Sequence, residues 1–66
     1  MKLENLEDIK ECAMEIAEVR KTGIVNMFNR AGVVEALYQF GYDFTAEYIR
    51  DNKEDYIELL EKSGEY

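Results

Sequence analysis

Cys12 is the only cysteine in a chain of 66 residues that has no histidine. One thiol cannot form a disulfide within the chain, and without histidine it cannot complete a structural zinc site. A chain this short buries only about 60% of the surface that its unfolded form exposes, so its stability depends on close packing or on self-association. We therefore expect one domain over residues 1–66 without a cofactor or metal ion. The sequence is compatible with either a monomer or a homodimer.

Hydrophobic spacing predicts an all-α fold. The chain contains no proline, so glycine and polar capping residues are left to end its helices. Apolar residues recur three and four positions apart from Leu6 to Ile16, as in an amphipathic helix, and Gly23 suits its left-handed end. The expected fold is a small bundle of three to four helices at about 3–22, 30–40, 44–51 and 53–62.

Three polar residues are expected to cap the later helices, because their side chains can accept a hydrogen bond from a free backbone N–H. Asn29 is assigned to the second helix, Asp43 to the third and Asn52 to the fourth. The chain at 51–52 is either a break between two helices or a bend within one. On the third helix, Phe44, Tyr48 and Ile49 are expected to face inward. The last helix carries the apolar residues Tyr56, Ile57 and Leu60.

Fifteen acidic and eight basic residues give the chain a net charge of −7. This charge argues against direct binding of nucleic acid, since phosphates require clustered Lys and Arg. It is compatible with a basic protein partner, and equally with a role in solubility alone. Most of the charge lies after residue 42, where the expected acidic face consists of Asp43, Glu47, Asp51, Glu54, Asp55, Glu58 and Glu61.

The sequence offers no catalytic set, so we expect that the protein is not an enzyme. Cys12 lacks a histidine base and is expected to be buried beside the apolar face of the first helix. The run 51–55 lacks the central glycine and the final glutamate of a calcium loop. The helix at 44–51 would be net negative as a DNA-recognition helix, which is the wrong charge for phosphate.

Eight aromatic residues are a large supply for a core of this size. Most are expected to fill the core, since bulky side chains contribute most to a small bundle. These core candidates are Phe28, Phe40, Phe44, Tyr48 and Tyr56. Some aromatic and methionine side chains must remain outside, and exposed Tyr and Met favour interfaces. The candidate partner surface consists of Met27, Phe28, Tyr38 and Tyr42.

The cellular location is predicted from the cysteine and from hydropathy. A lone cysteine suits a reducing compartment, and no stretch is long and apolar enough to span a membrane. The first residues lead into acidic side chains rather than into the apolar block of a signal peptide. We expect a cytoplasmic protein that makes no membrane contact.

One stretch of the chain has a distinctive composition. Residues 22–29 read Thr-Gly-Ile-Val-Asn-Met-Phe-Asn, and the pattern continues with Val33, Ala36, Gly41, Tyr48, Ile49 and Tyr56. Over about residues 16–60 it resembles a family of short proteins of unknown function that phages and mobile elements of Firmicutes encode, with the Asn-Met-Phe loop as its most specific part. Asn29 stands where that family usually has aspartate, and Gly32 lies in the first turn of the expected second helix. The resemblance implies a phage or mobile-element setting and supplies no functional residue.

These observations favour a non-enzymatic protein-interaction module that docks on a host protein or on a second copy. One alternative is an inhibitor that mimics nucleic acid, with carboxylates in place of phosphates on a basic enzyme. A further alternative is a small transcription-associated regulator that reaches DNA only through a basic partner. A docking module should depend on Met27 and Phe28, whereas binding by a mimic should weaken with salt and with charge reversal.

Overall fold

The computed structural model describes residues 3–66 and forms four α-helices and no strand within them. The helices are α1 (Leu6–Thr22), α2 (Arg30–Gln39), α3 (Asp43–Asp51) and α4 (Lys53–Ser63). This confirms the predicted all-α bundle. Within the same residues, no helix has both the length and the apolar character that crossing a membrane requires.

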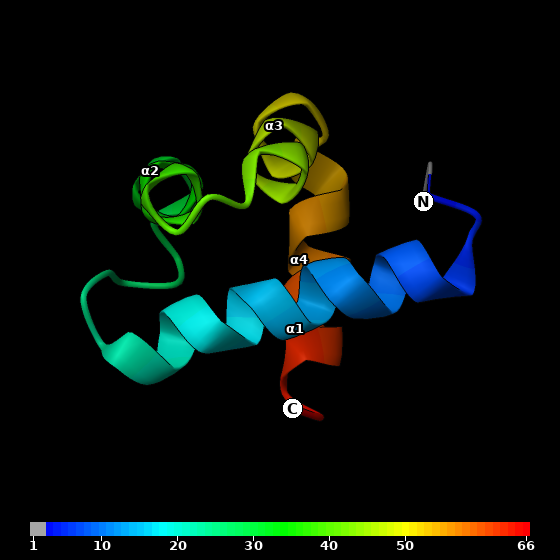
Figure 1. The fold of residues 1–66 in the computed structure, drawn as a ribbon, viewed down its shortest axis with the longest axis horizontal. Coiled ribbons are helices and arrows are strands. Elements are labelled where there is room, and N and C mark those ends of the chain that lie inside the picture. The colour runs from blue at the N-terminus through cyan, green and yellow to red at the C-terminus, as the bar shows by residue number, and fades with distance from the viewer. Residues whose placement is uncertain (1–2) are drawn as a thin grey trace.

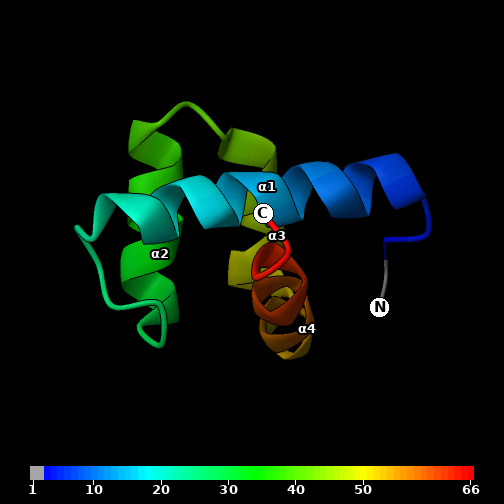
Figure 2. The same cartoon turned by 90° about the horizontal axis from the view of Figure 1, so that it is seen from below.

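The long helix α1 organises the other three. It runs across the molecule in Figure 1, and α4 crosses it, while α2 and α3 pack against each other on one side of α1. Figure 2 shows the same crossing from below, and α2 also crosses α1 there, behind its C-terminal part. The loop between α1 and α2 therefore lies at one end of α2, and the turn between α2 and α3 lies at the other end.

Two helix ends follow the predicted capping chemistry. Gly23 takes the left-handed conformation with φ of 70° after α1, which costs glycine little. The Asn29 side chain accepts a hydrogen bond of 3.2 Å from the backbone N–H of Gly32 at the start of α2. The first helix was predicted to begin near residue 3, but α1 begins later. Asn5 is extended there and accepts a hydrogen bond of 2.8 Å from the N–H of Glu7, so the helix begins at Leu6.

The predicted cap of α3 was wrong. Gly41 has φ of 85° and turns the chain so that the N–H of Tyr42 donates to the carbonyl of Leu37 over 2.8 Å. The helix then begins one residue early, with Asp43 as its first residue and Tyr42 at the cap position, where the Tyr42 side chain makes no hydrogen bond that caps the helix. The carboxylate of Asp43 lies in the first turn, where a negative charge is favourable.

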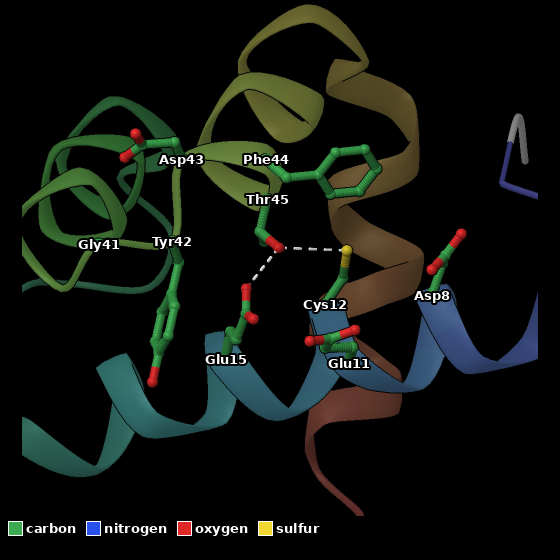
Figure 3. A pocket seen from close by; sticks show the side chains of 9 residues that line it. All are labelled: Asp8, Glu11, Cys12, Glu15, Gly41, Tyr42, Asp43, Phe44 and Thr45. Atoms are coloured by element: carbon green, nitrogen blue, oxygen red, sulfur yellow. Dashed lines mark hydrogen bonds between the residues drawn. The ribbon is translucent and has the colours of Figure 1, made fainter.

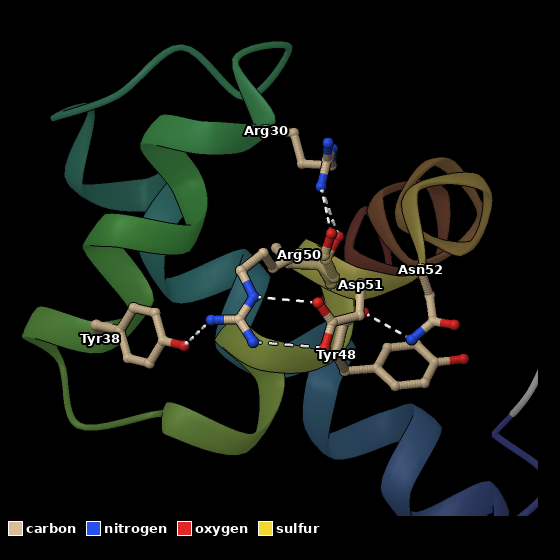
Figure 4. Close-up of polar contacts among 7 residues, drawn as sticks. Arg30, Tyr38, Tyr48, Arg50, Asp51 and Asn52 are labelled. Carbon is tan, nitrogen blue, oxygen red and sulfur yellow. Dashed lines mark hydrogen bonds and ion pairs between the residues drawn. The ribbon is translucent and has the colours of Figure 1, made fainter.

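The chain at Asn52 is a break between two helices, because φ of −128° and ψ of 69° at this residue are not helical. Asn52 occupies the N-cap position of α4 as predicted, but its side chain does not cap that helix. Its amide donates instead to the carbonyl of Tyr48, over 2.9 Å, and so closes the end of α3. Figure 4 shows this contact.

The core lies where α1 meets the other helices. It contains residues from every helix, and Cys12 and Tyr56 are buried in it as predicted. The largest fully buried side chains include Ile16, Leu37, Ile49 and Leu59.

Several large apolar side chains of the helices and loops are exposed to solvent. Leu6 is 81% exposed in the first turn of α1, and Phe44 is 61% exposed in the first turn of α3. On α4 the buried positions are Tyr56, Leu59 and Ser63, which leaves Ile57 on the outer side of the helix. Phe28 and Phe40 are also exposed, so the prediction that they fill the core was wrong.

Candidate docking surface

The loop between α1 and α2 holds one aromatic ring outside the protein. The side-chain carbonyl of Asn26 accepts a hydrogen bond of 2.9 Å from the N–H of Phe28, and the backbone carbonyl of Asn26 accepts one of 2.8 Å from the N–H of Asn29. An Asn side chain that bonds the backbone two residues on defines a tight local turn. The Phe28 ring at this turn is 85% exposed.

A buried tyrosine joins this loop to α4. The phenol of Tyr56 donates a hydrogen bond of 2.6 Å to the carbonyl oxygen of Met27, the residue before Phe28. Tyr56 is only 2% exposed, and its burial raises the pKa of the phenol to about 12. A neutral phenol therefore holds the loop against α4 throughout the physiological range of pH.

A hollow of about 430 Å³, open to solvent, lies between Phe28 and α4, and we call it the Phe28 hollow. Its walls are mainly apolar, and three charged side chains stand among them. Ile57 faces it with 54% of its surface exposed. The lining residues are Phe28, Arg30, Lys53, Glu54, Tyr56 and Ile57.

Arg30 has a structural contact that fixes one wall of the Phe28 hollow. Its guanidinium donates hydrogen bonds of 3.0 Å and 2.9 Å to the carbonyl oxygens of Ile49 and Arg50 at the end of α3 (Figure 4). Free carbonyls at a helix C-terminus attract a cation. The start of α2, the end of α3 and the start of α4 are thereby held close together.

The four residues predicted as a partner surface do not form one surface. Phe28 and the partly buried Met27 lie before α2, whereas Tyr42 lies after it, and a ten-residue helix spans about 15 Å. The hydroxyl of Tyr38 accepts a hydrogen bond of 3.1 Å from Arg50, as Figure 4 shows. Tyr42 donates to the carboxylate of Glu18. The structure instead brings Phe28 together with Ile57, which was not among the residues predicted as a partner surface.

The predicted acidic face is divided between α3 and α4. Six of its seven residues are exposed, while Asp55 is half-buried and accepts a hydrogen bond of 2.5 Å from the phenol of Tyr48. Asp51 forms an ion pair of 3.1 Å with Arg50. Glu54 lies at the edge of the Phe28 hollow.

A second hollow, of about 300 Å³, lies between α1 and the start of α3 (Figure 3). We call it the acidic hollow, because within residues 3–66 four carboxylates line it and no basic side chain does. Phe44 lies at its edge. The four carboxylates are those of Asp8, Glu11, Glu15 and Asp43.

The floor of the acidic hollow is a short polar chain across two helices. The hydroxyl of Thr45 donates to the Glu15 carboxylate over 2.5 Å and lies 3.3 Å from the sulfur of Cys12 (Figure 3). Burial raises the pKa of the Cys12 thiol, and nearby carboxylates, Glu15 foremost, raise it further, against the opposing effect of Thr45. Burial likewise raises the pKa of Glu15. The thiol is therefore held in its protonated form, which is the less nucleophilic form.

The acidic side chains do not converge on a cation site. Within residues 3–66, no group of three or more Cys, Asp or Glu side chains is arranged to hold a metal ion.

A family model described as a domain of unknown function (DUF5049) matches residues 7–60 of the chain. The matched range starts in the first turn of α1 and ends in α4, so it includes both walls of the Phe28 hollow. No curated protein and no solved structure matches the chain.

Proposed function

The chain belongs to the DUF5049 family, and we propose that it is a non-enzymatic protein-interaction module that docks through its Phe28 hollow. The observation that carries this proposal is the exposure of Phe28 itself, a large aromatic ring that the loop presents to solvent. Covering such a ring with a partner contributes about 1.5–3 kcal/mol. Aromatic anchors of this kind dominate the binding energy of protein interfaces.

The surroundings of Phe28 also suit an interface. An interface typically has an apolar centre inside a polar rim. Here Ile57 and the ring of Phe28 supply apolar surface, and Lys53 and Glu54 supply charged groups beside it. The hydrogen bond from Tyr56 to Met27 holds the loop in place before a partner arrives, which lowers the entropic cost of binding.

The chemistry of the remaining side chains supports a role without catalysis. The chain has no histidine, and the one thiol is buried with a raised pKa. A nucleophilic cysteine needs the opposite environment, with a lowered pKa and access to substrate. We extend the proposal to a phage or mobile-element protein on the basis of the loop at 26–28 described above. The lone cysteine supports the further proposal that it acts in the cytoplasm.

A second candidate is a nucleic-acid mimic, and the exposed carboxylates of α3 favour it. Asp43, Glu47 and Asp51 recur every four residues along this helix, so they lie along one face. Such a row could occupy a phosphate-binding groove of a basic enzyme. The Phe28 hollow would then play no part in binding.

Co-purification from the source cell separates the two candidates. A tagged chain is expressed beside an untagged copy, so that both foreign partners and a second copy are recovered. We expect a polypeptide that remains bound in high salt, disappears with Phe28→Ser and persists with Leu6→Ser. Leu6 is the matched control, because its side chain is 81% exposed and lies outside the Phe28 hollow.

The opposite pattern would support the mimic. In that case binding would be lost in high salt and in the charge-reversed variant Glu47→Lys, and Phe28→Ser would leave it intact. If no recovered polypeptide depends on Phe28 for its binding, the docking proposal is overturned.

A further inference from the structure

We infer that the Phe28 hollow is occupied by a second copy of this chain, related to the first by a two-fold axis. This inference rests on the proposed function, since it names the partner of the same surface. In a two-fold interface the same patch is used on both copies, so every contact occurs twice. The Phe28 ring of each copy would then cover the exposed Ile57 in the other.

Charge distinguishes this hollow from the others as a place for two copies to meet. Each chain carries a net charge of −7, so two copies repel each other over most of their surface. The acidic hollow would bring four carboxylates of one copy against four of the other. A third hollow, along the outer side of α1, is lined by four glutamates and one lysine. Among residues 3–66, the Phe28 hollow carries two basic side chains and one acidic side chain, and one of the basic groups, that of Arg30, already bonds carbonyl oxygens of α3. Of these three hollows, it is the one without an excess of negative charge.

The charged pair on α4 makes the patch complementary to itself. Lys53 and Glu54 are adjacent in the first turn, and both lie about one helical turn before Ile57. In the inferred dimer, the lysine of each copy would face the acidic group of the other across the two-fold axis. A patch with both signs of charge can pair with its own copy, because in a two-fold interface each contact between two different residues occurs twice.

The size of the chain provides a reason for association. A 66-residue domain has a small core, and apolar surface buried between two copies supplements it. Phe28 and Ile57 are exposed in the single chain. A dimer removes four large apolar side chains from water, two from each copy.

Sedimentation equilibrium of the full chain over a wide concentration range tests the inference. The wild type should shift from the 7.7 kDa monomer to a species of twice that mass as concentration rises. Phe28→Ser should raise the dimer dissociation constant about thirtyfold or more, and Leu6→Ser should leave it unchanged. Both sites are exposed, so circular dichroism should show folded variants.

A charge-swap series identifies the contact. Lys53→Glu and Glu54→Lys should each weaken the dimer, because each leaves like charges facing across the axis. A mixture of these two variants should form mixed dimers more readily than either forms its own. Glu61 and Lys62 are adjacent residues at the other end of α4 and lie outside the hollow. The variants Glu61→Lys and Lys62→Glu therefore provide a matched control, because they make the same changes in net charge.

The results separate this inference from the proposed function. A wild type that stays monomeric at every concentration would overturn the dimer, and a foreign protein bound through Phe28 would still support the docking module. A dimer that persists in Phe28→Ser would place the interface elsewhere and would also overturn the inference.

Discussion

The phenol of Tyr56 and the carbonyl of Met27 are joined by a hydrogen bond of 2.6 Å that links α4 to the loop between α1 and α2. These residues lie 29 positions apart in the chain. The bond sets the position of Phe28, because the neighbouring residue is fixed at its carbonyl. It also explains why Phe28 and Ile57 face the same hollow.

Replacing Tyr56 by phenylalanine should destabilise the protein by about 1–2 kcal/mol, since the Met27 carbonyl loses its donor. The apolar ring remains, so the core should stay filled. Urea unfolding measures the change in the free energy of unfolding, and hydrogen exchange should show faster exchange of the loop amides at 24–29. An unchanged stability with unchanged exchange would show that the bond does not hold the loop.

Tyr56 also predicts a loss of stability at high pH. Its pKa is raised from 10.0 to about 12 in the folded protein by burial. A raised pKa means that the folded state retains the proton more tightly, so stability falls as pH rises from 10 toward 12. Over this range of pH, the ionisation of Tyr56 should lower the free energy of unfolding by about 2–3 kcal/mol. Unfolding in urea across this range should show a steeper decline for the wild type than for Tyr56→Phe, and parallel curves would contradict the assignment.

Gly32 should resist substitution although it lies in a helix, where alanine normally stabilises by about 1 kcal/mol. A Cβ at this position would lie 2.6 Å from Cγ2 of Val25 and 3.0 Å from the side-chain nitrogen of Asn29. Gly32→Ala should therefore lower the melting temperature. In a protein that already carries Val25→Ala, Gly32→Ala should lower the melting temperature by less, because the smaller side chain at position 25 makes room for the new Cβ. Additive effects would contradict a direct clash.

Cys12 should react with thiol reagents only when the protein opens. Its side chain is 1% exposed, and its pKa is raised by burial. The rate of modification in native buffer should therefore follow the rate or extent of opening, and should rise sharply with urea. Rapid modification without denaturant would indicate an accessible, reactive thiol and would reopen the question of catalysis.

The sequence was sufficient for the helices because their ends depend on local chemistry. Gly23 and Asn29 act through bonds within a few residues, and both were predicted correctly. Asp43 failed as a cap because the turn at Gly41 starts α3 one residue earlier, and that turn depends on a hydrogen bond back to Leu37.

Burial was harder to predict, because it depends on how the helices cross. Leu6 belongs to the apolar pattern of α1 but is its first residue, and its side chain remains 81% exposed. Ile57 and Leu59 are both apolar residues of α4, and only the crossing with α1 determines that Leu59 is buried. The candidate surface was therefore found only in part. Phe28 was named from the sequence, whereas its neighbour Ile57 required the packing of α4.

The most direct test of the docking surface is photo-crosslinking in the source cell. A photoreactive phenylalanine analogue replaces Phe28 in one strain and Leu6 in another, because both positions are exposed on the free chain. We predict that the analogue at position 28 forms a crosslink to a polypeptide, a second copy or another protein, and that the analogue at position 6 does not. Equal crosslinking at the two positions, or none at position 28, would contradict the account.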